Sequence, residues 1–168
     1  MKTQTRRGLL KDAAGVAVGA AGMMAVATPP VAEAKDKDHI VWEKQAVQKP
    51  GPDGKVPPPG DKPPLFNSIV TFGNLVFLAG VGAHFDGTIE EHTKHVLDEL
   101  EENLKLAGSS MEKVLKVNVY LNDIKDWPRM NTVYQGRWGN VPPVRTTVAP
   151  SGGIPGGSLV EIDLIAYK

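Results

Sequence analysis

The hydrophobic residues between positions 65 and 168 change their spacing from segment to segment, and this pattern most constrains the fold. Apolar and β-branched runs predict strands at 68–72, 75–81, 114–121, 144–149 and 159–167. Spacing of the i, i+3, i+4 kind predicts one helix starting at Ile89 and a second from Asp126 to Gly139. The predicted order is therefore β-β-α-β-α-β-β, which is an α+β fold.

Local signals mark the ends of several elements. Gly73-Asn74, between the first two strands, favours a two-residue hairpin turn. Thr88, followed by Glu91 three positions later, predicts a capping box at the start of the first helix. Gly108 predicts the end of that helix.

Two helices cover only one face of such a sheet, so the other face is left for solvent or for another subunit. The last strand has the same asymmetry, because its two faces carry different residues: Val160, Ile162, Leu164 and Ala166 on one, and Glu161, Asp163 and Ile165 on the other. We interpret the second face as a subunit contact that contains a polar site. The alternative is a merely solvated sheet face.

Residues 1–34 resemble a cleaved secretory signal, with a basic start, an Ala/Gly/Val run at 13–27 and the ending Ala32-Glu33-Ala34. Arg6-Arg7 indicates the twin-arginine type, and a general secretory signal is the alternative. As a helix the run would span only about 22 Å, too short for a membrane core, so no stable membrane anchor is expected. We therefore predict passage through the twin-arginine export machinery, cleavage after Ala34 and a periplasmic or secreted product.

Residues 35–64 are rich in proline, glycine and lysine, a composition that blocks helices and interior strands. We expect either a packed arm or a disordered linker, with His39-Ile40-Val41-Trp42 as its only candidate for a short edge strand. The predicted domains are a signal at 1–34, an arm or linker at 35–64 and a folded domain at 65–168.

Composition limits the chemistry further. The 168 residues include no cysteine, which excludes disulfides, thiolate metal sites and a cysteine nucleophile. The 19 basic and 19 acidic residues balance, and loss of the signal removes four basic and two acidic residues, leaving a net charge of −2. No nucleic-acid partner is therefore expected. Without a phosphate-binding glycine loop or a known metal motif, no cofactor and no metal are predicted.

The histidines permit one metal hypothesis. His92 and His95 lie at i, i+3 on the first predicted helix, and His84 comes shortly before them. A helical wheel places His92 at the border of the apolar side and His95 on the polar side. The favoured interpretation is a solvated helix face that explains both residues.

Arg145 and Glu161 are the residues best suited to chemistry. An arginine inside an apolar, β-branched strand is costly to bury, so it either pairs with an acid or receives an anionic ligand. Its planar guanidinium matches a carboxylate through two parallel hydrogen bonds. The alternative is a purely structural ion pair between Arg145 and Glu161.

Five segments follow one another in a specific order: Phe72 to Gly80, Val117 to Leu121 with Asp126, Met130-Asn131 with Tyr134, Pro143 to Val148, and Leu159 to Ile162. Together, over residues 64–168, they resemble the RidA/YjgF family of reactive-intermediate deaminases. The resemblance implies a chorismate-mutase-like fold and a homotrimer with one site in each cleft between subunits. It implies that Arg145 holds a substrate carboxylate and that Glu161 directs the water that hydrolyses an imine. Asn131 and Gly80 match positions that line the cleft.

The chain departs from the family pattern at three positions, with Phe66 in place of a tyrosine, Ala79 in place of a serine and Thr147 in place of a cysteine. Phe66 and Ala79 have no side-chain donor for a ligand, whereas Thr147 retains a hydroxyl. Two functions follow as hypotheses. The first is an exported deaminase that converts 2-imino or 2-enamino acids into 2-oxo acids and ammonia. The second is a non-catalytic trimeric binding module for small carboxylates or carbonyl compounds.

Overall fold

The computed structural model describes residues 42–58 and 60–168. The export signal predicted at 1–34 and the first three residues of the run at 39–42 lie outside the described residues. Within the described part, every helix is too short or too polar to cross a membrane.

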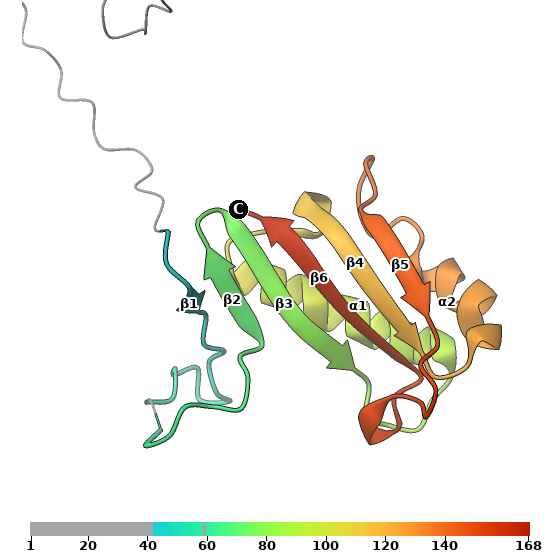
Figure 1. Ribbon diagram of the computed structural model, residues 1–168, viewed down its shortest axis with the longest axis horizontal. Coiled ribbons are helices and arrows are strands. Elements are labelled where there is room, and N and C mark those ends of the chain that lie inside the picture. Colours follow the sequence, from blue (N-terminus) through green and yellow to red (C-terminus); the bar gives the residue numbers. More distant parts are fainter. Residues whose placement is uncertain (1–41, 59) are drawn as a thin grey trace, which may run out of the picture. The chain divides into compact units, whose positions relative to one another are not determined.

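Six strands form one mixed sheet, and both helices lie on the same face of it (Figure 1). The strands are β1 (Gln45–Ala46), β2 (Ile69–Phe72), β3 (Leu75–Gly82), β4 (Val114–Leu121), β5 (Val144–Val148) and β6 (Val160–Tyr167). The α-helices are α1 (Ile89–Leu106) and α2 (Trp127–Tyr134), and the short 3-10 helices are η1 (Met111–Lys113), η2 (Ile124–Asp126) and η3 (Pro155–Gly157). The strand order is β1-β2-β3-β6-β4-β5, with β4 and β5 parallel and the other neighbours antiparallel. The predicted α+β fold is confirmed.

The β2–β3 hairpin forms as its turn residues predict. Phe72 pairs with Leu75, so Gly73-Asn74 is the whole loop. Gly73 has a φ of +57°, in the left-handed region that glycine adopts most easily. The two-residue turn therefore fixes the register of the two strands.

The start of α1 forms as predicted, whereas the end of α2 does not. The Thr88 hydroxyl accepts from the Glu91 N–H at 3.3 Å, and the Glu91 carboxylate accepts from the Thr88 N–H at 2.7 Å, which confirms the capping box. The predicted end of α2 at Gly139 is wrong, because the helix ends at Tyr134. The next residue is extended, with a ψ of 136°, and Gly136 then has a φ of +84°. The first of two glycines in this segment thus turns the chain.

The core lies between the sheet and α1. The even-numbered residues of β6 are at most 1% exposed, as their alternation predicts. They belong to one hydrophobic cluster with the apolar side of α1, which contributes Ile89, Val96, Leu97, Leu100 and Leu104. The odd-numbered residues of β6 point to the opposite face, which we call the open face.

The open face has an apolar part and a polar part. By strand register the apolar part comprises Phe72, Leu75, Phe77, Ile165 and Tyr167. The polar part comprises Asn118, Tyr120, Glu161 and Asp163. No α-helix of the described residues covers this face (Figure 1).

The segment before the domain contributes the edge strand β1. Gln45 and Ala46 pair with β2, whereas Trp42 lies outside any strand and meets the Phe72 ring edge-on at 5.7 Å between centroids. Lys49 continues the contact through an ion pair of 2.8 Å with Glu99 of α1. Residues 42–49 therefore pack as an arm against the domain.

Candidate functional site

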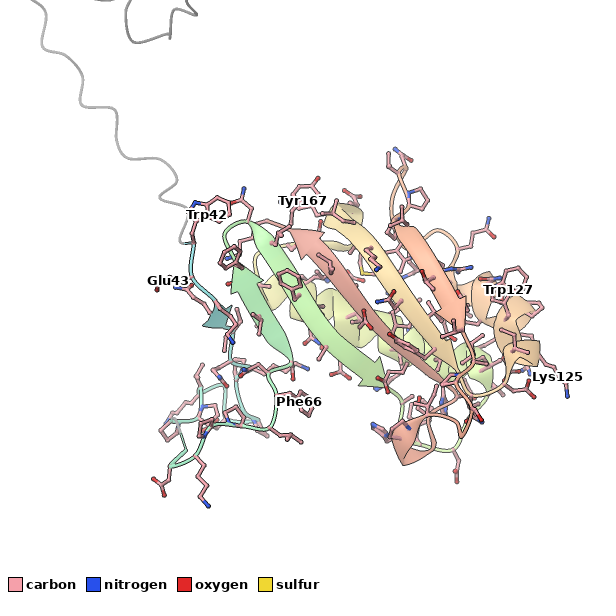
Figure 2. The ribbon with its side chains drawn as sticks, in the orientation of Figure 1. Trp42, Glu43, Phe66, Lys125, Trp127 and Tyr167 are labelled. Carbon is pink, nitrogen blue, oxygen red and sulfur yellow. The ribbon has the colours of Figure 1, made fainter. Side chains whose placement is uncertain are left out.

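The seven site residues predicted from the sequence fall into two groups in this structure. One group lies where β5 meets α2 and contains Asn131, Arg145 and Thr147. The other lies around the end of β3 and the start of β6 and contains Phe66, Ala79, Gly80 and Glu161. Figure 2 shows the separation, with Phe66 on the β2 side of the sheet and Trp127, a neighbour of the first group, on the β5 side.

Arg145 faces the helix side of the sheet. It lies beside Val117 in the parallel β4–β5 ladder, and Val117 is fully buried in the core. Neighbouring residues in register share a face, so the Arg145 side chain points toward α2. There its Nη1 donates to the Asn131 Oδ1 at 2.8 Å, and its guanidinium carbon lies 4.5 Å from the centre of the Tyr134 ring. Asn131 and Tyr134 thus hold the guanidinium in place.

Arg145 borders a cavity of about 380 Å³ that it shares with Thr147, Ile124 and Trp127. We call it the Thr147 pocket. The Thr147 Oγ1 is buried and has no hydrogen-bond partner among the described residues. Within that same part of the chain, no carboxylate lies within ion-pair distance of Arg145. The Arg145 guanidinium therefore borders this cavity without an acidic partner, while the Thr147 Oγ1 is closed off from solvent.

The structural ion pair between Arg145 and Glu161 does not form in this chain. Glu161 alternates with the buried residues Val160 and Ile162, so it points to the open face. Arg145 points to the helix face, and β4 separates its strand from β6. The sheet itself keeps the two side chains apart.

Gly80 sets the position of the Glu161 carboxylate. A Cβ atom at position 80 would come within 2.8 Å of the Glu161 Cδ, closer than Cβ contacts normally occur. The space exists because β3 has an irregularity between Leu78 and Val81, where its pairing with β6 shifts. Gly80 therefore lets the carboxylate lie directly against the strand.

Phe66 and Ala79 line a cavity of about 220 Å³ together with Gly80, Lys49 and His84. Phe66 is 67% exposed and contributes only an apolar ring. Ala79 contributes only a methyl group. Two of the three positions at which the chain departs from the family pattern, Phe66 and Ala79, therefore line one cavity with Gly80.

A polar network on the open face adjoins Glu161. Asp163 accepts from the Asn118 amide at 2.8 Å and from the Tyr120 hydroxyl at 3.1 Å. Burial raises the pKa of Tyr120, and the charges of Asp163 and Glu161 raise it further, so the phenol stays protonated. Glu161, Asp163 and Tyr120 line a cavity of about 330 Å³. Sequence analysis did not place Asn118 and Tyr120 in a site, although both alternate with buried residues of β4.

The three histidines near α1 do not form a metal site. His92 is 1% exposed, so the solvated helix face is wrong for this residue. Its Nδ1 accepts from the Leu159 N–H at 3.1 Å, which leaves Nε2 to donate to the Phe85 carbonyl at 2.8 Å. Loops on two sides therefore close over His92. His95 is half exposed, and within residues 42–58 and 60–168 no three potential ligands lie together.

A family model described as endoribonuclease L-PSP matches residues 62–168. Among curated proteins, the mitochondrial protein mmf2 of Schizosaccharomyces pombe is 43% identical over an alignment of 111 residues, and the match covers 61% of this chain and 87% of that protein. The family match thus spans β2 to β6 and both α-helices, and it does not include β1.

Solved structures of related proteins have the same fold as this chain. A member of the YjgF protein family from Neisseria meningitidis has a TM-score of 0.62 and 25% identity, over 76% of this chain and 96% of that one. RidA from an Antarctic Psychrobacter has a TM-score of 0.62 and 24% identity, over 74% of this chain and 99% of that one, a likeness of fold.

Proposed function

The chain belongs to the endoribonuclease L-PSP family, the family of the YjgF and Rid proteins, and from this premise we propose that it is an exported deaminase. Its substrates are 2-imino or 2-enamino acids, and its products are 2-oxo acids and ammonia. The reaction takes place in clefts between the subunits of a homotrimer. The observation that carries the proposal is the placement of Arg145 and Glu161 on opposite faces of the sheet.

That placement favours a site built from two chains. Arg145 lies on the edge strand β5 and has an anion-binding group without an acid beside it. Glu161 lies on the open face against Gly80, where another subunit would cover it. If the β5 edge of one copy approached the open face of the next, the cation and the carboxylate would meet around one small ligand. Neither group has this partner within its own chain.

The proposed chemistry needs no group beyond these side chains and one water. An enamine first tautomerises to the imine, whose carbon is electrophilic. Arg145 holds the substrate carboxylate, and Glu161 takes a proton from water as the water oxygen bonds to the imine carbon. Glu161 passes this proton to the imine nitrogen, the new hydroxyl group gives up its proton to the same nitrogen, and the carbonyl forms as the C–N bond breaks and ammonia leaves. One water is consumed for each ammonia released.

Ammonia and 2-oxo-acid release from freshly generated imino acids tests the proposal. We expect wild type to exceed the spontaneous rate, and Arg145→Ala and Glu161→Gln each to return it to that rate. Arg129→Ala is the matched control, because Arg129 is exposed and its hydrogen bonds go to Glu90 rather than to Arg145 or Glu161. A wild-type rate equal to the spontaneous rate contradicts the proposal.

Phe66 and Ala79 favour a second candidate, a non-catalytic trimeric module that binds small carboxylates or carbonyl compounds. Both residues lie beside Gly80 and offer no side-chain donor to a reacting ligand. This candidate predicts ligand binding without turnover. A thermal-shift series with 2-oxo acids tests it, and it fails if no stabilisation depends on Arg145.

Export and the choice of substrate belong to the same proposal. Arg6-Arg7 and the following apolar run support a periplasmic or secreted location. Replacing both arginines by lysine should leave the precursor in the cytoplasm, as cell fractionation would measure. The family description names an endoribonuclease, but a mature net charge of −2 does not favour RNA as a substrate.

A further inference from the structure

The cavity beside Gly80 has a charged wall that the proposed reaction does not use. This is the cavity of about 220 Å³ that Phe66 lines, and its wall also contains Lys49 of the arm and Glu99 of α1. We call it the Lys49 pocket. The family model matches residues 62–168, so Lys49 lies outside the matched segment. Neither the family resemblance nor the proposed deaminase reaction gives the lysine or its acidic partner a role.

The arm brings Lys49 to this place by strand pairing. β1 pairs with β2, and the next residue, Val47, donates its N–H to the Ile69 carbonyl at 3.0 Å. Val47 and Lys49 are partly buried, whereas Gln48 between them is exposed. Val47 packs against the hydrophobic core, so Lys49 is on the side of the arm that faces the domain. There its Nζ donates to the Glu99 Oε1 at 2.8 Å.

This ion pair leaves hydrogen-bonding capacity on both partners. An ammonium group has three donors, and among the described residues Lys49 uses one of them, on the Glu99 Oε1. The Glu99 Oε2 lies 3.9 Å from the His95 Nε2, beyond hydrogen-bond distance. The two side chains are 37% and 35% exposed, so a ligand can reach both. The pocket therefore offers a donor and an acceptor side by side.

Two paired charges of opposite sign select an uncharged polar group. A carboxylate would be attracted by Lys49 but repelled by Glu99. An apolar group would remove water from both charges without replacing the lost hydrogen bonds, which is costly. A primary amide avoids both penalties, because its carbonyl oxygen accepts from the ammonium and its NH₂ donates to the carboxylate. The Phe66 ring provides an apolar surface for the carbon chain that carries the amide.

We propose that Lys49 and Glu99 form a specificity subsite that binds a terminal primary amide. The preferred substrates are then 2-imino acids with a short side chain that ends in an amide. The cavity volume of about 220 Å³ is the share of about seven water molecules in the liquid, which limits the length of that chain. The inference rests on the proposed function for the position of the reacting end, whereas binding of the amide itself needs no turnover.

Three carboxylates of the same shape test the subsite. Succinamate, succinate and 4-methylpentanoate have the same arrangement of heavy atoms, and they end in an amide, a carboxylate and an isopropyl group. In isothermal titration calorimetry, wild type should bind succinamate about three- to tenfold more tightly than each of the other two. Lys49→Met should lose most of the preference over 4-methylpentanoate. Glu99→Gln leaves Lys49 without its acidic partner and should bind succinate more tightly than succinamate.

Lys94→Met is the matched control, because Lys94 forms the same kind of ion pair with Asp98 on α1 but does not line the pocket. It should bind all three compounds as wild type does. Because the Trp42 ring contacts the domain, an unchanged Trp42 indole ¹H–¹⁵N signal verifies that the arm stays in place in each variant.

The proposal is overturned if succinamate is not the tightest ligand of wild type, if Lys49→Met keeps the full preference, or if Glu99→Gln does not favour succinate. Preferential binding of succinamate without deaminase activity would remove the proposed function and leave this subsite. Deaminase activity without that preference would do the reverse.

Discussion

At the scale of single residues, the site depends on side chains that are small or absent. Gly80 leaves room for the Glu161 carboxylate, and Thr147 lines one pocket together with Arg145. Sequence reasoning identified all four residues, because each belongs to an ordered motif. It misjudged His92, because a helical wheel describes one helix and not the loops that close over it.

Gly80→Ala tests the role of the missing side chain. The added Cβ would displace the Glu161 carboxylate, and a small misplacement of a reacting group is costly in rate. We expect deaminase activity to fall by about ten- to a hundredfold while the chain still folds. Gly60→Ala is the matched control, because the nearest atom to its Cβ is the Lys62 carbonyl oxygen at 3.7 Å. Full activity in Gly80→Ala would show that the carboxylate position is unimportant.

His92→Phe tests a structural residue that lies outside the proposed site. The phenyl ring fills a similar volume but cannot accept from the Leu159 N–H or donate to the Phe85 carbonyl. We expect the free energy of unfolding to fall by about 1–3 kcal/mol, as measured by urea denaturation. His95→Phe is the control, because His95 is half exposed. Equal stabilities of the two variants would contradict the structural role.

At the scale of elements, prediction succeeded where the signal is local. The Gly73-Asn74 turn and the Thr88 cap depend on residues within four positions of each other, and both form as predicted. The end of α2 was misplaced because two glycines, Gly136 and Gly139, can each stop a helix. The strand β1 was missed because Gln45 and Ala46 gain their conformation only by pairing with β2.

The ion pairs between α1 and the segment after α2 make the free energy of unfolding depend on pH. Arg137 donates to Asp98 at 2.9 Å and to Glu101 at 3.3 Å. Burial alone would raise the pKa of Asp98, but hydrogen bonds from Lys94 and Arg137 outweigh it and hold that pKa below its usual value. A carboxyl group whose pKa is lower in the folded than in the unfolded state stabilises the fold at pH values above its unfolded-state pKa. This stability is lost as the pH falls through the folded-state pKa.

Arg137→Gln should therefore lower the free energy of unfolding at pH 7 by only about 0.2–1 kcal/mol, since the pairs are partly solvated. The difference from wild type should shrink as the pH falls below about 4, where the carboxyl groups become protonated. Urea denaturation at several pH values measures both effects. Lys62→Gln, on an exposed loop, should match wild type throughout. A difference that does not change with pH would show that Arg137 acts through packing.

At the scale of the whole molecule, sequence reasoning named Arg145 and Glu161 but not their separation. Alternation along one strand indicates which of its residues lie on the same face. It does not indicate which face of the sheet the residues of a distant strand occupy. The parallel pairing of β4 with β5 places Arg145 on the helix face, and only the assembled sheet shows this.

Mixing two inactive variants tests the proposed two-chain site. A subunit with Arg145→Ala still carries Glu161, and a subunit with Glu161→Gln still carries Arg145. In randomly mixed trimers refolded from equal amounts, about a quarter of the clefts should combine both native residues. We therefore expect about a quarter of the wild-type rate, and mass measurement in solution should give three chains per particle. No recovery of activity would contradict a shared site.

The central place of β6 in the strand order also bears on how the protein is made. This strand comes last of the six along the chain, yet it lies between β3 and β4 and joins the two halves of the sheet. Until its eight residues leave the ribosome, β3 and β4 have no strand between them, and the buried side chains of β6 are missing from the core. Glu161 arrives with the same strand. A nascent chain therefore gains its complete sheet and its candidate acid–base group in one late step, and a message truncated before codon 160 would yield neither.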